Sequence, residues 1–308
     1  MSLAEAIQMS FINDGLFCLS EAYERFPEKP SNTIRGRIYD NLGIRFERVS
    51  KGIYRTIGDK GGCILVEGDG RKLDMLDDES IDCIVCDHPW DCKSNKGGNR
   101  NFANKYDCFN YTLEDFKEKA RVLKDGHFLV EILPTENANN YDYLYQIKVM
   151  AKKCGLNYYA SIPWKKGNFV ANTGRSSKNT EQILFLFKGN TPRKLRIDFK
   201  KSKAADREVY MAGTNGMLPT NFDVQPVPKN KKIHQSEKPV ALYERILSYI
   251  ACHGDLVLDQ YAGSGALGEA ALNYGLNCIL IEKLKENIKK IGYVSYLRDR
   301  YDIKTTTP

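Results

Sequence analysis

The stretch that decides the fold reads Asp255-Leu256-Val257-Leu258-Asp259-Gln260-Tyr261-Ala262-Gly263-Ser264-Gly265-Ala266-Leu267-Gly268. It joins a short apolar strand to a glycine-rich turn and then to the start of a helix. Gly263 and Gly265 let the backbone turn tightly and approach a ligand without interference from a Cβ atom. Gly268 lets the helix lie close to the sheet. This order of elements predicts a nucleotide-type cradle at the carboxyl edge of a sheet.

An acidic residue follows the turn at a distance that suits an adenosine. Glu282, seventeen residues after Gly265, ends the next predicted strand, Cys278-Ile279-Leu280-Ile281-Glu282. A carboxylate at this place can accept hydrogen bonds from both hydroxyls of a ribose. Dinucleotide oxidoreductases use a similar turn, but their fingerprint is Gly-x-Gly-x-x-Gly with a helix end facing a pyrophosphate. The form from Asp259 to Gly265 instead resembles the S-adenosylmethionine-binding motif of methyltransferases.

The chain from Gly61 onward alternates apolar runs with amphipathic segments, which predicts an α/β fold with a mostly parallel sheet. We expect buried strands at Cys63 to Val66, Ile81 to Cys86, His127 to Leu133, Asn157 to Ile162, Gln182 to Phe187, Leu256 to Leu258 and Asn277 to Ile281. We expect helices at Leu113 to Leu123, Tyr143 to Cys154, Pro239 to Cys252 and Gly265 to Tyr274. The last residues, Thr305 to Pro308, are expected to form a frayed tail.

A second group of informative residues is Asp87-His88-Pro89-Trp90, directly after the predicted strand Ile81 to Cys86. Ligands of α/β proteins bind at the carboxyl edge of the sheet, so we expect catalysis here. An exocyclic amine of a base is a poor nucleophile, because its lone pair is delocalised into the ring. Asp87 and the carbonyl of His88 can accept its two N–H bonds and localise the lone pair toward a methyl donor. Pro89 stiffens the turn, and Trp90 offers a flat face for a flipped base.

These four residues and their position resemble the β class of DNA amino-methyltransferases, in which an Asp-Pro-Pro-Tyr box precedes the cofactor motif. Further pieces extend the resemblance over most of residues 61 to 292, namely Gly68-Asp69-Gly70, Arg121-Val122-Leu123-Lys124-Asp125-Gly126-His127 and His234-Gln235-Ser236-Glu237-Lys238-Pro239-Val240. The resemblance implies a Rossmann-like sheet with helices on both faces, S-adenosylmethionine as cofactor and double-stranded DNA as substrate. It implies cofactor contacts at Asp69 and Gly70 near the adenine, at Gln235, Ser236 and Lys238 near the methionine end, and at Asp259, Tyr261, Ala262, Gly263, Ser264, Gly265 and Glu282 along the cradle.

Two residues of the box decide between alternative functions. Asp87 favours the N6 amine of adenine, because the family tends to place Ser there for the N4 amine of cytosine. Cytosine remains an alternative, since it uses the same acceptors. His88 stands where the family has proline, so the loop loses a rigid residue and gains an imidazole. A DNA-binding regulator with a decayed box is therefore a further alternative, and methylation of RNA or of a protein glutamine amide is a more distant one.

Residues 1 to 60 have a pattern of their own, with short helical stretches before a hairpin. Ser31-Asn32 can cap a helix through Leu42, whose apolar residues Ile34, Ile38 and Leu42 recur every four positions. The run from Phe46 to Ile57 forms two β-prone arms about a Ser-Lys-Gly turn. This order resembles winged helix-turn-helix domains of the HARE-HTH type. The resemblance implies DNA contacts from Arg35 and Arg37 on the helix and from Lys51 in the wing. The alternative is a helical cap that packs on the catalytic domain or contacts another protein.

Positive charge gathers in one segment of the chain. Between Lys188 and Lys232 there are eleven Lys or Arg against four acids, an excess that equals the net charge of +7 of the whole chain. Such a segment is either a solvated loop or a surface that meets phosphates. By family analogy it is an inserted target-recognition region within a catalytic domain of residues 61 to 308. The DNA contacts expected here and in the polar loop from Asp91 to Asp107 are Lys93, Lys96, Arg193, Lys194, Lys200 and Lys201.

Composition and cysteine usage indicate a cytoplasmic protein. No apolar run approaches the roughly 20 residues that a membrane span needs, and the N-terminus lacks the pattern of a secretory signal. Nine cysteines form no even framework, and we expect thiols rather than disulfides. Cys83 and Cys86 lie on one predicted strand and point to opposite faces, so they cannot hold one metal ion, and no metal is expected. The family resemblance leaves open a cognate restriction nuclease and a homodimer.

Overall fold

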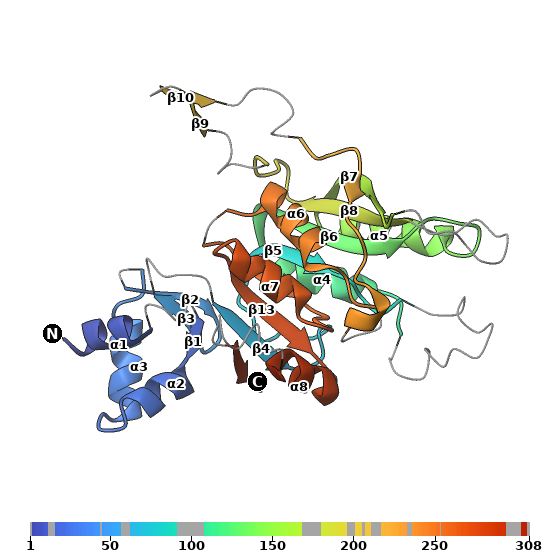
Figure 1. The fold of residues 1–308 in the computed structure, drawn as a ribbon. Coiled ribbons are helices and arrows are strands. Elements are labelled where there is room, and N and C mark those ends of the chain that lie inside the picture. The colour runs from blue at the N-terminus through green and yellow to red at the C-terminus, as the bar shows by residue number, and fades with distance from the viewer. Residues whose placement is uncertain are drawn as a thin grey trace.

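The computed structural model has two parts, a small N-terminal part and a large α/β part (Figure 1). It describes residues 2–11, 16–43, 45–56, 62–90, 108–167, 180–195, 201–204, 207–210, 217–232, 236–252, 254–293 and 303–306. Among these residues no helix is long and apolar enough to cross a membrane.

The N-terminal part contains three helices and a three-stranded antiparallel sheet with the order β1-β3-β2. Its elements are α1 (Leu3–Phe11), β1 (Leu16–Cys18), α2 (Leu19–Arg25), α3 (Ser31–Tyr39), β2 (Phe46–Ser50) and β3 (Ile53–Thr56). A separate apolar core holds them together, formed by Ile7, Phe11, Phe17, Ala22, Ile34, Ile38, Phe46 and Tyr54. Three helices followed by a hairpin is the order expected from the sequence, and membership of a winged-helix family stays a prediction.

Helix α3 begins and ends differently from the prediction. Its N-cap is Pro30, whose carbonyl accepts the amide hydrogens of Thr33 and Ile34 at 2.8 and 3.2 Å, and no side chain caps the helix. The predicted capping by Ser31-Asn32 is therefore wrong, because both residues already lie in the first turn. The helix stops at Tyr39 and does not reach Leu42. Ile34 and Ile38 are fully buried, which confirms the predicted apolar face.

The large part is built on a nine-stranded sheet with the order β11-β7-β8-β6-β5-β12-β13-β4-β14. The neighbouring strands β6, β5, β12, β13, β4 and β14 all run parallel to one another. Strand β8 is antiparallel to both of its neighbours, β6 and β7. The strands are β4 (Cys63–Glu67), β5 (Ile81–Cys86), β6 (Leu123–Pro134), β7 (Leu156–Lys165), β8 (Thr180–Lys188), β11 (Phe222–Asp223), β12 (Leu256–Asp259), β13 (Asn277–Glu282) and β14 (Ile303–Thr306). All seven predicted strands of this part are present, although β6 and β7 are longer than expected.

Helices cover both faces of the sheet, as predicted. One face carries α6 (Val240–Ile250), α7 (Ala266–Asn273) and α8 (Lys285–Tyr293), and the other carries α4 (Leu113–Val122) and α5 (Tyr141–Lys153). Within β5, Cys83 belongs to the core under the first face and Cys86 to the core under the second. The two thiols therefore point to opposite faces, as their spacing predicted.

Thr305 and Thr306, the first half of the expected frayed tail, lie in a strand, and Thr307 and Pro308 lie outside the described residues. Ile303–Thr306 form β14, which pairs in parallel register with β4 over four residues, from Cys63 to Val66. Without β14, β4 would be an edge strand with unpaired backbone groups, and the β-branched residues of this segment suit a strand. For Thr305 and Thr306 the expectation of fraying was wrong, because it rested on their position at the end of the chain and did not consider the open edge of β4.

The N-terminal part packs against the α4 and α5 side of the large part. Leu16 and Ile53 belong to the apolar core of that side. The amide of Lys51, in the hairpin turn, donates to the carbonyl of Met75 at 3.0 Å, and Arg48 forms an ion pair with Asp77 at 3.2 Å. The backbone of the predicted wing is thus held by the large part, while the Lys51 side chain is exposed.

A second, small hairpin belongs to the basic insert. It is formed by β9 (Lys201–Ala204) and β10 (Arg207–Tyr210), which pair antiparallel and are drawn away from the sheet in Figure 1. The insert also contains the 3-10 helix η4 (Lys229–Lys231), which precedes α6.

Candidate active site

The site lies where the sheet changes its direction of winding. Strands β5 and β12 are neighbours, but the chain leaves β5 toward β6 on one side and leaves β12 toward β13 on the other. The loops after these strands therefore diverge and open a crevice at their carboxyl ends, where α/β proteins bind ligands. Asp87–Trp90 form one loop and Gln260–Gly265 the other, so the fold brings together the two motifs singled out from the sequence.

The glycine turn has the geometry that its sequence predicted. Gly263 and Gly265 have φ angles of +52° and +79°, which favour glycine, and Gly265 is the N-cap of α7. A Cβ atom at Gly268 would lie 2.7 Å from Cδ1 of Leu280, so the glycine allows α7 to pack closely on β13. The amide of Gly263 donates to Oε2 of Glu282 at 2.8 Å. The predicted ribose acceptor thus lies beside the turn, and its other oxygen, Oε1, accepts the amide of Leu284 at 2.8 Å.

The loop after β4 meets the glycine turn very closely. A Cβ atom at Gly70 would lie 1.8 Å from the carbonyl oxygen of Gln260. The Gln260 side chain donates to the Gly70 carbonyl at 2.5 Å, which ties the loops after β4 and β12 together. Asp69 lies on the same loop and accepts the amide of Arg71 at 3.1 Å. The predicted contacts to the adenine end of the cofactor therefore border the cradle.

Asp87 is held by a buried lysine. Its carboxylate is 17% exposed and its Oδ2 atom lies 2.5 Å from Nζ of Lys238, which is 7% exposed. Oε2 of Glu181 lies 3.6 Å from the same ammonium, and Glu181 also forms an ion pair with Lys166. Burial raises the pKa of Asp87 to about 6, although Lys238 opposes that shift. At neutral pH the carboxylate is ionised and can accept hydrogen bonds from an amine.

Sequence reasoning missed Glu181, although it placed a strand directly after it. Glu181 pairs with Pro134 at the carboxyl end of β6, because β8 runs antiparallel and its amino end reaches the active edge. Strand direction cannot be deduced from the apolar run of β8 alone. Lys238 was expected near the methionine end of the cofactor, and the structure places its ammonium group against Asp87. Ser236 is exposed just before it.

Trp90 and Pro89 complete the catalytic loop. Nζ of Lys238 lies 5.6 Å from the centroid of the Trp90 ring, within the range of a cation–π contact. The amide of Phe109 donates to the carbonyl of Pro89 at 3.1 Å and ties the loop to the segment before α4. The predicted base acceptors and the predicted stacking surface therefore come from one loop whose two ends are held.

The residues at this edge fit S-adenosylmethionine. The donor carries a sulfonium and an ammonium group, and the carboxylates of Asp87, Asp259 and Glu282 lie at the carboxyl ends of three adjacent strands. Burial raises the pKa of Asp259 to about 7, and the nearby Asp87 and Glu282 add to the shift. A cationic ligand relieves the repulsion among these carboxylates, and the positive-φ glycines leave room for an adenosine.

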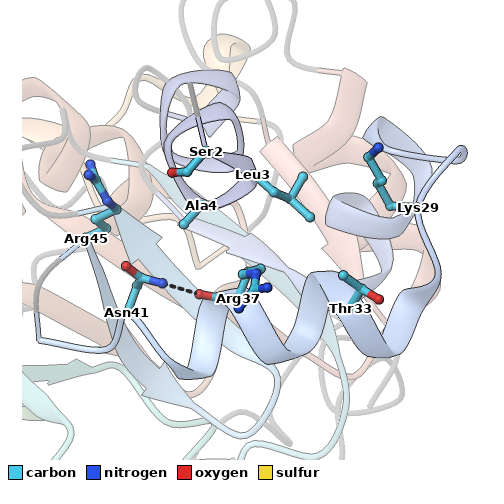
Figure 2. Close-up of a pocket in the computed structure, with 8 residues that line it drawn as sticks. All are labelled: Ser2, Leu3, Ala4, Lys29, Thr33, Arg37, Asn41 and Arg45. Carbon is cyan, nitrogen blue, oxygen red and sulfur yellow. Dashed lines mark hydrogen bonds between the residues drawn. The ribbon is translucent and has the colours of Figure 1, made fainter.

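Those predicted DNA-binding residues whose side chains the structure describes are not gathered in one place. Arg35 and Arg37 are exposed on α3, and Arg37 lines a pocket between α1 and α3 that Figure 2 shows. Arg193 forms an ion pair with Asp255 at 2.5 Å, just before β12 and so at the edge of the sheet opposite the active site, and Lys194 beside it is exposed. The structure therefore does not bring Arg193 to the catalytic edge. Outside the described residues lie Lys93, Lys96, Lys200 and Gln235, and only the backbone of Lys201 is described.

Comparison with known proteins agrees with this geometry. A family model described as DNA methylase matches residues 81–292. The type II methyltransferase M.HpaI of Haemophilus parainfluenzae is 29% identical over 242 residues, which are 75% of this chain and 71% of that protein. The structure of an M1.HpyAVI-SAM complex has a TM-score of 0.52 at 21% identity and covers 75% of this chain and 98% of that one. That of the cytosine-N4-specific PvuII DNA methyltransferase has a TM-score of 0.58 at 15% identity and covers 76% and 88%.

The matching family model and the two loops at the switch point of the sheet together define a methyltransferase that uses S-adenosylmethionine. The chain belongs to the family of N6 and N4 DNA methylases, because the family model covers more than half of its length. It is therefore a DNA amino-methyltransferase, of a family whose substrates are the N6 amine of adenine and the N4 amine of cytosine.

Proposed function

We propose that this enzyme methylates the N6 amine of adenine in double-stranded DNA. The observation that carries the proposal is the ionised, mostly buried carboxylate of Asp87 beside the cofactor cradle. The presence of Asp rather than Ser at this position supports adenine over cytosine, by the family resemblance. Specific DNA sequences are the substrates implied by the similarity to the type II enzyme M.HpaI.

The chain's residues would activate the amine by accepting its hydrogens. S-adenosylmethionine supplies the methyl group when bound. The Oδ1 atom of Asp87 and the carbonyl of His88 would accept the two N–H bonds and direct the nitrogen lone pair toward the methyl carbon. As the N–C bond forms and the donor's C–S bond breaks, the nitrogen becomes acidic and its proton passes to solvent. A separate general base is not required, and Asp87 is the candidate if one acts.

The target base must leave the duplex to reach this edge. Trp90 would stack on the flipped base, which is worth about 1 to 3 kcal/mol by analogy with single-strand binding. This offsets much of the cost of unstacking, which is on the order of a few kcal/mol. The arrangement of Trp90 next to the two acceptors supports this role.

Residues 1–60 would act as an accessory DNA-binding domain, and the basic insert at about 188–232 as the target-recognition region. The exposed guanidinium groups of Arg35 and Arg37 support the first assignment. Arg193 is not part of the proposed surface, because Asp255 already pairs with it. A homodimer and a cognate restriction nuclease are also part of this proposal, on the strength of the family resemblance.

One alternative has a specific observation in its favour. The fold is also similar to that of PvuII DNA methyltransferase, which is cytosine-N4-specific. Methylation of cytosine N4 would use the same acceptors and the same stacking surface. It is the second candidate function.

The test is transfer of labelled methyl from S-adenosylmethionine to mixed-sequence duplex DNA, followed by digestion and mass analysis of the nucleosides. We expect N6-methyladenine. N4-methylcytosine would replace the proposal with the alternative. Label in RNA but not in DNA, or intact donor binding without transfer to either, would contradict both.

A further inference from the structure

His88, which stands where the family has proline, is built into the protein interior. It is 2% exposed, and its ring centroid lies 4.0 Å from that of Tyr111 at an angle of 34°. Phe109 lies against it on another side, with the centroids 5.8 Å apart. A loop residue whose side chain is enclosed in this way has its backbone fixed as well, because the ring cannot turn without displacing its neighbours. The carbonyl of His88 is one of the two proposed acceptors.

Tyr143 of α5 determines how this ring is oriented. Its hydroxyl lies 2.8 Å from Nε2 of His88 and accepts the amide hydrogen of Tyr111 at 3.0 Å. Nδ1 of His88 faces the carboxylate of Glu131, with 3.8 Å between Nδ1 and Oε2. A neutral imidazole is most stable here with its hydrogen on Nδ1, toward the carboxylate, and Nε2 then accepts the hydroxyl hydrogen of Tyr143. Burial lowers the pKa of His88, so the ring is neutral.

The buried pair Lys119–Glu131 joins this ring to the cofactor loops. Both side chains are fully buried, with 3.0 Å between Nζ of Lys119 and Oε1 of Glu131. Tyr111 donates its hydroxyl to the same carboxylate. The ammonium also donates to Oε1 of Gln260 at 2.5 Å, and the Gln260 amide in turn donates to the Gly70 carbonyl. One connected polar network therefore spans the loops after β4, β5 and β12.

We propose that Tyr143 is a positioning residue for methyl transfer, which acts by holding His88 and, with the Lys119–Glu131 pair, fixes the catalytic loop relative to the cofactor cradle. In this chain the network replaces the rigidity that proline gives the loop elsewhere in the family. The inference rests on the proposed function of the Asp87–Trp90 loop. Tyr143 itself is not one of the proposed base or donor contacts, so the effect of changing it should appear in the transfer step and not in donor binding.

The experiment compares Tyr143→Phe with Tyr145→Phe. Tyr145 lies on the same helix but is 61% exposed, so loss of its hydroxyl controls for the chemical change alone. We expect kcat with saturating DNA and donor to fall between about 10-fold and 100-fold in Tyr143→Phe, since a misplacement on the order of 1 Å has such an effect. The Kd for S-adenosylmethionine should stay within about twofold of the wild-type value. For comparison, a tenfold change in Kd corresponds to about 1.4 kcal/mol of binding free energy. Tyr145→Phe should equal the wild type in both.

A double-mutant cycle separates positioning from a general loss of stability. If Tyr143 acts through His88, adding Tyr143→Phe to His88→Phe should lower kcat little further. Additive losses, or a Tyr143→Phe enzyme with wild-type kcat, would overturn the proposal.

A readout that needs no activity uses Trp90 as the reporter. The chain has two tryptophans, and Trp164 is only 1% exposed, so acrylamide quenching of fluorescence reports mainly on Trp90. Tyr143→Phe should raise the quenching constant and Tyr145→Phe should not; equal quenching in both would overturn the positioning role. If the wild-type enzyme transferred no methyl to DNA, the proposed function would fail, while this measurement would still decide whether Tyr143 holds the loop.

Discussion

Gly70→Ala should weaken cofactor binding although it adds a single methyl group. The new Cβ atom would lie 1.8 Å from the carbonyl oxygen of Gln260 and 2.8 Å from its carbonyl carbon, both backbone atoms of the cofactor turn. Ordinary contacts begin near 3.4 Å, so the two loops must move apart by more than an ångström. Overpacking of this kind costs about 1 to 3 kcal/mol.

This free-energy cost destabilises the conformation that binds the donor, because the same displacement breaks the hydrogen bond from the Gln260 side chain to the Gly70 carbonyl. If the loops bind only in the closed arrangement, the Kd for S-adenosylmethionine should rise about 5-fold to 150-fold. Isothermal titration calorimetry measures it directly.

Gly36→Ala is the matched control. A Cβ atom at Gly36 has nothing within 4 Å, and the residue lies inside α3, where Ala is favoured over Gly by about 1 kcal/mol. This variant should bind the donor as the wild type does and unfold at the same or a slightly higher temperature. A Gly70→Ala enzyme with wild-type Kd would refute the close approach of the two loops and their role in holding the donor.

Three further predictions concern charge. The transfer rate should fall as the pH drops through about 6, because the acceptor role needs the ionised form of Asp87, whose raised pKa lies there; a flat rate profile between about pH 5 and 8 would contradict this. Lys119→Met should lower the free energy of unfolding by about 3 to 5 kcal/mol, because it leaves Glu131 buried and unpaired, and adding Glu131→Leu should recover much of the loss in thermal unfolding. Replacing Arg35 and Arg37 by Ala should reduce the salt dependence of DNA binding by about 0.9 in log–log slope for each phosphate that is no longer neutralised, and an unchanged slope in fluorescence anisotropy would exclude α3 from the interface.

Much of the fold follows from local sequence. The run Ile81 to Cys86 is almost wholly apolar, which is typical of a strand buried on both faces, and β5 has the predicted bounds. The glycine turn was predictable for a similar reason, since Gly263, Gly265 and Gly268 each meet a distinct steric demand. Because both motifs follow parallel strands, the sequence also indicated that they meet at one edge.

The residues that sequence reasoning missed depend on long-range geometry. Glu181 reaches the active edge only because β8 runs antiparallel, and its apolar run does not encode direction. Arg193 lies at the opposite edge for the same reason, because β8 ends there and Asp255 then pairs with the guanidinium. Lys119 and Glu131 did carry a signal. Glu131 interrupts an apolar strand, and Lys119 follows Phe116 by three residues on the buried face of its helix.

The most direct test of the role of Asp87 compares the wild-type enzyme with Asp87→Asn in single-turnover methyl transfer to duplex DNA, with donor binding measured on the same preparations. We expect transfer to be lost while the Kd for S-adenosylmethionine stays within a few-fold of the wild-type value, because the predicted donor contacts at the glycine turn and Glu282 do not include Asp87. Transfer by Asp87→Asn at the wild-type rate would contradict the central claim that this carboxylate accepts the hydrogens of the target amine.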